Sequence, residues 1–132
     1  MNPALQTLAE TILSISCDAN GISFNVNFSV SDINKSCLDK LYQEYLQFIE
    51  LSEKRISEIF GDEWESIDEF YELMQPIQNQ TERDFIYTRN KCGCGFWDGD
   101  WMKDVSEILE DECKKFSEII AIYDNEKIYL YL

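Results

Sequence analysis

The sequence predicts a single α+β domain, with about four helices packed on a small antiparallel sheet of about three strands that ends in a C-terminal β-hairpin. Three observations predict this fold. Apolar residues recur at helical spacing over several long stretches, and the last stretch alternates around an Asp-Asn turn. The 132 residues are 45% hydrophobic and 14% aromatic. A chain of this length and composition can build one sizeable core, so we expect one domain over residues 1–132.

The N-terminal part of the chain predicts a helix followed by a less regular segment. Asn2 supplies an N-cap and Pro3 suits the first helical turn, so we expect a helix from about residue 3 to residue 16. Its apolar face is formed by Leu5, Leu8, Ile12 and Ile15. Residues 22–30 then alternate between apolar and polar side chains, which indicates either a strand or an extended segment lying on the core.

The middle of the chain predicts two more helices. Ser36 and Asp39 suit a reciprocal cap at the start of the longest helix, which we expect to reach Phe60. Its apolar stripe consists of Leu38, Leu41, Tyr42, Tyr45, Ile49, Ser52, Ile56 and Ile59. A glycine ends this helix, and residues 62–74 predict a shorter one, which is followed by a polar loop over 75–82.

The C-terminal half predicts the sheet and one more helix. A short apolar run indicates a strand over 84–88, and a glycine-containing turn over 90–95 leads to a helix over about 100–117. The two stretches 119–123 and 127–131 flank a turn and indicate a β-hairpin. We expect the three strands to form one antiparallel sheet that helices cover on one face.

The charge balance restricts the kind of partner. The 26 acidic residues against 11 basic ones give a net charge of -15, which argues against direct binding to nucleic acid, because phosphates require Lys and Arg. A partner should therefore be basic. No apolar run approaches the roughly 18 residues that span a membrane, and the first residues lack the basic start of a secretory signal. We therefore expect no membrane association and a cytoplasmic protein.

The residue types that are missing or scattered bear on catalysis. The chain has no histidine, which excludes Ser-His and Cys-His nucleophile pairs and removes the commonest metal ligand. Its five cysteines are odd in number and scattered, and a reducing compartment favours no disulfide. Cys92 and Cys94 are only one residue apart, a poor match to zinc-binding or redox pairs. We expect no metal and no cofactor.

The segment 91–98 has alternative interpretations. The favoured one is structural: its two glycines permit a tight turn, while Phe96 and Trp97 enter the core. A hard cation is the alternative, although the spacing of the carboxylates is not that of an EF-hand loop. The carboxylates concerned are those of Asp98, Asp100 and Asp104. The same groups would also suit general acid or base roles, but no partner group is evident.

The acidic residues are concentrated in two segments. Residues 50–72 contain nine carboxylates and residues 98–112 contain seven, so 16 of the 26 lie within 38 residues. On helices they would lie opposite the apolar stripes and face solvent. Such faces are either simply solvated or approximate the charge density of duplex DNA, one unit per ~1.7 Å of axis, and so fit a nucleic-acid-binding channel. Charge alone favours the first interpretation.

A motif in the C-terminal half resembles that of a family of small proteins from bacteriophages and related mobile elements. The family pattern is Asp-Phe-x-x-Thr-Arg-Asn-Gly-His-Gly-Ala-Gly-Phe-Trp-Asp. The matching residues are Asp84, Phe85, Thr88, Arg89, Asn90, Gly93, Gly95, Phe96, Trp97 and Asp98. Residues 28–33 resemble the family's Tyr-Ser-Val-x-Asp-Ile segment, and 122–129 resemble its closing hairpin. Cys92 replaces the family's histidine and Cys94 its alanine, so imidazole chemistry is not expected.

The resemblance implies an anti-defence role, because small acidic phage proteins often occupy the nucleic-acid-binding surface of host nucleases. We therefore expect a non-enzymatic inhibitor, anti-CRISPR or anti-restriction, that acts as a DNA mimic in the cytoplasm of a bacterial host. The predicted partner-binding residues are Glu58, Asp62, Glu63, Glu65, Asp68, Glu69, Glu72, Asp98, Asp100, Asp104, Glu107 and Asp111. The predicted motif loop consists of Arg89, Asn90, Gly93, Gly95, Phe96 and Trp97.

Two other functions remain alternatives. The first is a phage or plasmid accessory protein that assembles with itself, with Trp64, Tyr71 or Trp101 in the subunit contact. The second is a metal-dependent enzyme centred on residues 88–98.

Overall fold

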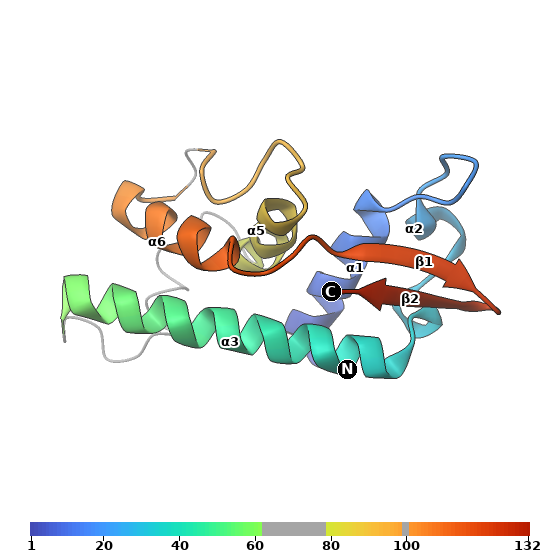
Figure 1. Ribbon diagram of the computed structural model, residues 1–132, viewed down its shortest axis with the longest axis horizontal. Helices are drawn as coiled ribbons and strands as arrows, with labels where there is room; N and C mark the ends of the chain where they lie inside the picture. Colours follow the sequence, from blue (N-terminus) through green and yellow to red (C-terminus); the bar gives the residue numbers. More distant parts are fainter. Residues whose placement is uncertain (62–78, 99–100) are drawn as a thin grey trace.

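The computed structural model describes residues 1–61, 79–98 and 101–132, and these form an α+β fold (Figure 1). The helices are α1 (Pro3–Ile15), α2 (Phe24–Asn27), the 3-10 helix η1 (Val30–Asp32), α3 (Lys35–Phe60), α5 (Gln80–Arg89) and α6 (Lys103–Cys113), and the strands are β1 (Ile120–Asp124) and β2 (Lys127–Tyr131). Helix α3 runs along most of the molecule, α6 lies along its C-terminal half, α5 lies near its middle, and the hairpin lies beside its N-terminal half. The predicted helix over 62–74 lies outside the described residues.

Asparagines begin the two long N-terminal helices. The side chain of Asn2 accepts hydrogen bonds from the N–H groups of Ala4 (2.8 Å) and Leu5 (3.3 Å), which confirms the predicted N-cap of α1. The predicted cap of α3 at Ser36 is wrong. Helix α3 starts earlier, because Asn34 accepts from the Cys37 N–H (3.2 Å) and its own N–H donates to the Ile128 carbonyl.

The alternating stretch over 22–30 is not a strand. A single antiparallel bridge pairs Cys17 with Ser23, and α2 and η1 follow. The side chains of Ile22 and Val26 are exposed while that of Phe24 is buried, so the alternate apolar residues do not share one buried face. The segment does lie on the core, as the second interpretation expected, but it does so as two short helical turns.

The predicted strand over 84–88 is also wrong, because these residues belong to the helix α5. Phe85 and Ile86 are the only apolar residues among the buried positions of α5. Because they are adjacent, they suggested a short strand. The remaining buried positions of α5 are the polar residues Gln80, Thr81, Asp84, Thr88 and Arg89. The buried positions taken together recur at helical spacing. The spacing of apolar residues alone does not reveal this helix, because most of its buried residues are polar.

The C-terminal hairpin is confirmed, but within the described ranges the sheet has two strands and not three. Strands β1 and β2 pair from Ile120 opposite Tyr131 to Asp124 opposite Lys127. Asn125 and Glu126 make the turn with positive φ angles of 48° and 66°, the geometry that suits a two-residue hairpin. Helix α6 is shorter than the predicted 100–117.

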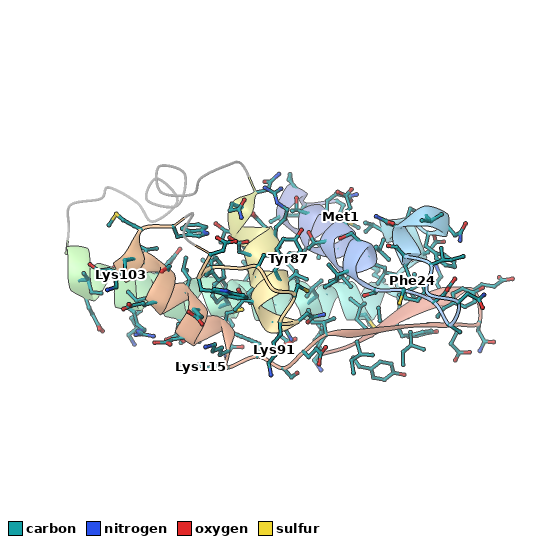
Figure 2. The ribbon with its side chains drawn as sticks, turned by 90° about the horizontal axis from the view of Figure 1, so that it is seen from above. Met1, Phe24, Tyr87, Lys91, Lys103 and Lys115 are labelled. Carbon is teal, nitrogen blue, oxygen red and sulfur yellow. The ribbon has the colours of Figure 1, made fainter. Side chains whose placement is uncertain are left out.

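The aromatic centre of the core joins α3, α5 and the chain before α6. The ring of Phe48 lies 4.7 Å from that of Phe85 and 5.8 Å from that of Phe96, and Phe96 meets Trp101 edge-on at 5.6 Å. All four side chains are buried, and the side chains drawn in Figure 2 fill the space between the helices. None of the helices in the described ranges combines the length and apolar character that crossing a bilayer requires.

Candidate functional site

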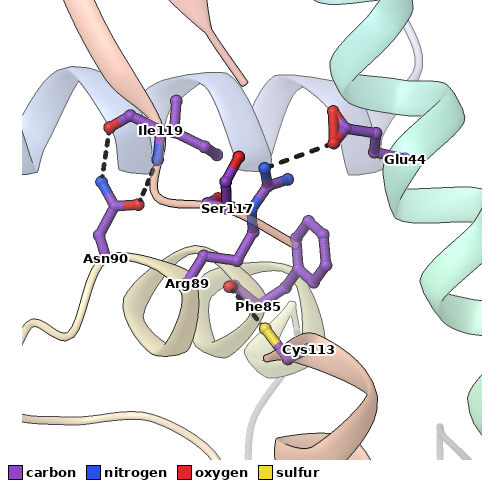
Figure 3. Close-up of polar contacts among 7 residues, drawn as sticks. All are labelled: Glu44, Phe85, Arg89, Asn90, Cys113, Ser117 and Ile119. Atoms are coloured by element: carbon purple, nitrogen blue, oxygen red, sulfur yellow. Dashed lines mark hydrogen bonds and ion pairs between the residues drawn. The ribbon is translucent and has the colours of Figure 1, made fainter. Parts of the chain in front are cut away.

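Arg89 of the motif loop is a buried structural residue. Its side chain is 0% exposed, and its guanidinium group lies between the rings of Phe85 and Phe116, 5.3 and 5.4 Å from their centroids. Figure 3 shows its Nε donating to the Ser117 carbonyl (2.9 Å) and its Nη2 contacting Glu44 of α3 (3.4 Å). Burial lowers the pKa of Arg89, an effect that Glu44 opposes. The residue thus ties α5 to α3 and to the chain before β1.

Asn90 fixes the start of the hairpin. Its side-chain amide donates to the Ile119 carbonyl (2.9 Å), and its Oδ1 accepts from the Ile119 N–H (2.8 Å) (Figure 3). The side chain therefore satisfies both backbone groups of Ile119, as a neighbouring strand would.

The remaining motif residues fold the 91–98 loop back on α5. Thr88 Oγ1 accepts from the Phe96 N–H (3.2 Å), which holds the ring of Phe96 in the core. Gly95 has a φ of +154°, and a Cβ there would lie 2.4 Å from Thr88 Oγ1 and 2.4 Å from Trp97 Cζ3. Asp98 accepts weakly from the Gly95 N–H (3.4 Å). These contacts give the motif a structural role in closing the turn.

Asp84 at the start of the motif is buried and fully engaged. It accepts hydrogen bonds from Gln80 Nε2 and from the indole N–H of Trp101, both at 2.8 Å. Trp101 is therefore buried inside the protein, and the prediction that it lies in a subunit contact is wrong. Trp64 and Tyr71, the other residues predicted there, lie outside the described ranges.

The exposed part of the loop carries thiols and an indole. Cys92 reaches solvent, and so does the side chain of Trp97, which is 43% exposed. The prediction that Trp97 enters the core is therefore wrong, and only Phe96 does so. A shallow hollow of about 700 Å³ lies between Trp97, Lys91 and Lys114. Burial raises the pKa of the Cys92 thiol and Cys94 adds to the shift. For Cys94, burial again comes first, followed by the charges of Asp84 and Asp98. Both groups are therefore thiols at neutral pH, unlike the thiolates of redox enzymes.

The metal alternative has no ligand cluster in the part of the chain that the structure describes. No group of three or more Cys, Asp or Glu side chains converges there. Asp98 is exposed and contacts Gly95, Asp104 is exposed on α6, and Asp100 lies outside the described ranges.

No family model, curated protein or solved structure matches this chain. The resemblance of residues 84–98 to phage proteins therefore stays a prediction.

The predicted acidic surface is described in part. Glu58 near the end of α3 and Asp98 after the turn are exposed, as are three carboxylates on α6. Those on α6 belong to Asp104, Glu107 and Asp111. The predicted residues outside the described ranges are Asp62, Glu63, Glu65, Asp68, Glu69, Glu72 and Asp100.

Basic residues pair with one carboxylate of this surface, that of Asp111, and with the buried carboxylate of Glu112. Arg55 of α3 contacts Asp111 at 3.6 Å and Glu112 at 3.2 Å, and Lys115 contacts Glu112 at 2.7 Å. Burial alone would raise the pKa of Glu112, but the hydrogen bonds from Lys115 and Arg55 outweigh it and lower that pKa. Within the described residues, Asp104 and Glu107 form no ion pair, so these two keep an exposed, uncompensated charge.

Two features of the surface and core were not predicted from the sequence. The ion pair between Glu44 and Arg89 joins residues far apart in the chain, and no local signal marks it. The second is an exposed apolar face on the hairpin, at Ile120 and Ile122. A signal for this face was present in the sequence, because residues 119–123 are all apolar. A hairpin that packs on the core with one face buries only every second residue, so the other apolar residues had to be exposed.

Proposed function

We propose that this protein binds a basic surface of another protein and occupies a groove that otherwise holds nucleic acid. The observation that supports this proposal is the carboxylate stripe of α6, formed by Asp104, Glu107 and Asp111. At 100° per residue the three positions fall within about 60° of the helix circumference. The stripe therefore faces one way, and the packing of α6 on α3 holds it in place.

The spacing of the three carboxylates shows how many further charges a DNA-like surface would need. With a rise of ~1.5 Å per residue, the three carboxylates extend over about 10 Å of helix axis. One DNA strand carries a charge every ~3.4 Å of axis, so the stripe alone is sparser than DNA. Glu58 is exposed near the end of α3, and this end of α3 lies at the same end of the molecule as the start of α6 (Figures 1 and 2). The predicted carboxylates of residues 62–72 would have to supply the rest.

The finer form of the proposal is an inhibitor of a host defence nuclease complex, either anti-CRISPR or anti-restriction. It rests on the motif resemblance together with the net charge of -15. A mimic of this kind associates fast and with strong dependence on salt, because opposite charges steer the encounter.

The test is charge reversal on α6 with a matched control. Asp104→Lys with Glu107→Lys should raise the concentration that half-inhibits a susceptible nuclease about tenfold, since two favourable charge contacts become repulsive. Glu10→Lys with Asp39→Lys changes the net charge equally, at exposed positions on α1 and α3, and should leave inhibition almost unchanged.

The measurement is DNA cleavage by a panel of purified restriction and CRISPR nucleases, at low and at physiological salt. Circular dichroism checks that both double variants fold. Equal loss of inhibition in the two variants would show a non-specific charge effect and contradict the α6 surface. No inhibition of any nuclease in the panel by the parent protein would contradict the anti-defence form.

A further inference from the structure

Among the residues that the structure describes, no strand pairs with the outer edge of β1. Both backbone groups of Ile119 point to the side chain of Asn90, away from β2. Because backbone groups alternate in direction along a strand, those of Ala121 and Tyr123 point to the same side. Within residues 1–61, 79–98 and 101–132, no backbone group pairs with them. Asn90 thus terminates the pairing at Ile119, and the next two positions remain open.

The face of the hairpin that points away from the core is apolar and exposed. Ile120 is 54% exposed, Ile122 is 45% exposed and Tyr131 is 59% exposed. The register places Ile120 opposite Tyr131 and Ile122 opposite Tyr129, so these four side chains share one face. A free strand edge beside such a face is a template for strand addition.

A hollow runs beside this edge. It has a volume of about 410 Å³ and lies between β1 and the loop that follows α1, with Asp18, Phe24, Ala121 and Tyr123 in its wall. Figure 1 shows this loop on the side of β1 that faces away from β2. Asp18 holds the loop in shape, because its Oδ1 accepts from the N–H groups of Asn20 and Ile22. An added strand would therefore place one apolar side chain against Phe24.

The charges around the edge determine what would bind there. Glu118, Asp124 and Glu126 are exposed at the two ends of β1. Lys127, the basic residue next to the hairpin turn, points away from this edge, since its Nζ donates to the Ser31 carbonyl (3.3 Å). A second copy of β1, paired antiparallel about Ile122, would set Glu118 opposite Glu126, which is repulsive. A basic segment meets complementary charges at both ends.

We propose that the β1 edge binds an extended segment of a partner protein in which lysine or arginine residues alternate with apolar ones. The segment adds a third strand to the sheet by pairing with the backbone of Ala121 and Tyr123. One of its apolar side chains enters the hollow beside Phe24, and its basic side chains reach Glu118 and Asp124. This surface is separate from the carboxylate stripe of α6.

The test uses a short peptide of alternating lysine and valine with blocked ends, titrated into the full chain and followed by the amide NMR shifts of residues 119–124. Ala121→Pro removes the outward N–H at an edge position where proline is tolerated, and should weaken binding about tenfold. Ala121→Val keeps that N–H and serves as the matched control, with affinity close to that of the parent. The same peptide with glutamate in place of lysine should not bind.

Three results would overturn the proposal. The first is no binding of the lysine-valine peptide to the parent chain, and the second is equal binding by the proline variant. The third is a concentration-dependent dimer in sedimentation that Ala121→Pro dissociates, which would make a second copy the occupant.

If Ala121→Pro does not fold, Asp124→Lys replaces it, because it should weaken the binding of the basic peptide without altering the backbone. The α6 reversal variants should bind the peptide normally, so this test and that of the proposed function fail independently.

Discussion

At the scale of single residues, the motif of residues 84–98 is a set of contacts that close a turn. Each of its polar members reaches a partner across the turn or in another element: Asp84 reaches Trp101, Thr88 reaches Phe96 and Asn90 reaches Ile119. These contacts give each of these residue types a structural role at its position in the motif.

Gly95 gives the sharpest test of that structural role. Gly95→Ala should lower the free energy of unfolding by about 3 kcal/mol, because the new Cβ meets Thr88 and the Trp97 ring at a φ that L-residues avoid. Gly93→Ala is the matched control, since its φ is +84° but open space surrounds it. It should cost about 1 kcal/mol from the backbone alone. Urea unfolding measures both, and equal losses would mean that the contact at Gly95 is unimportant.

Arg89 illustrates how little a residue type says about its role. The sequence places Arg89 beside a glycine-containing turn, which does not tell whether its side chain is exposed or buried. In the structure, the guanidinium of Arg89 is buried between two rings and paired with Glu44. Its partners lie on α3 and before β1, so only the packed chain reveals them.

At the scale of elements, α6 combines a buried carboxylate with an exposed stripe. Glu112 is 3% exposed and held by Arg55 and Lys115, whereas Glu107, five residues earlier, faces solvent. The two faces of one helix therefore make different contributions: one anchors α6 on α3, and the other is available to a partner.

The anchoring face predicts a pH dependence. The pKa of Glu112 is lowered in the folded state, so its pairing stabilises the protein above the unfolded pKa of about 4.3, and this stability is lost as the pH falls through the folded value. Glu112→Gln should reduce the free energy of unfolding at neutral pH by about 2 kcal/mol, and the difference from the parent should shrink in acid. Urea unfolding between neutral and acid pH measures it. Glu107→Gln is the exposed control, and a difference that grows in acid would contradict the pairing.

At the scale of the whole molecule, the net charge of -15 opposes the compact state. Among the described residues, carboxylates pair with Arg55, Arg89, Lys114 and Lys115. Exposed carboxylates such as those of Asp104 and Glu107 face water, where added salt screens their charge.

Sodium chloride should therefore stabilise this protein. Raising it from about 0.01 to about 0.5 M should add about 1 kcal/mol to the free energy of unfolding, or roughly 4 °C in Tm for a domain of this size. Calorimetry at several salt concentrations tests the expectation. A variant with Glu10→Gln and Asp39→Asn should show a smaller salt effect. Stability that falls with salt would mean that the ion pairs outweigh the repulsion.

The sequence by itself determined the elements whose signals are local. Asn2 with Pro3 marked the start of α1, and a long apolar stripe marked α3. The turn signal at Asp124 and Asn125 marked the hairpin, whose turn lies one residue later, at Asn125 and Glu126. Each of these signals depends on neighbouring residues, so the chain need not be folded for it to be recognised.

The tertiary structure alone decided the rest. It made α5 a helix whose buried face is largely polar. The polar groups of this face bind partners from distant parts of the chain, such as Trp101, Glu44 and the Ser117 carbonyl. It also left β1 with an open edge, since Asn90 satisfies Ile119 and no described strand pairs with the next residues. Polar burial and strand neighbours both depend on contacts that form only on folding, so no local pattern contains them.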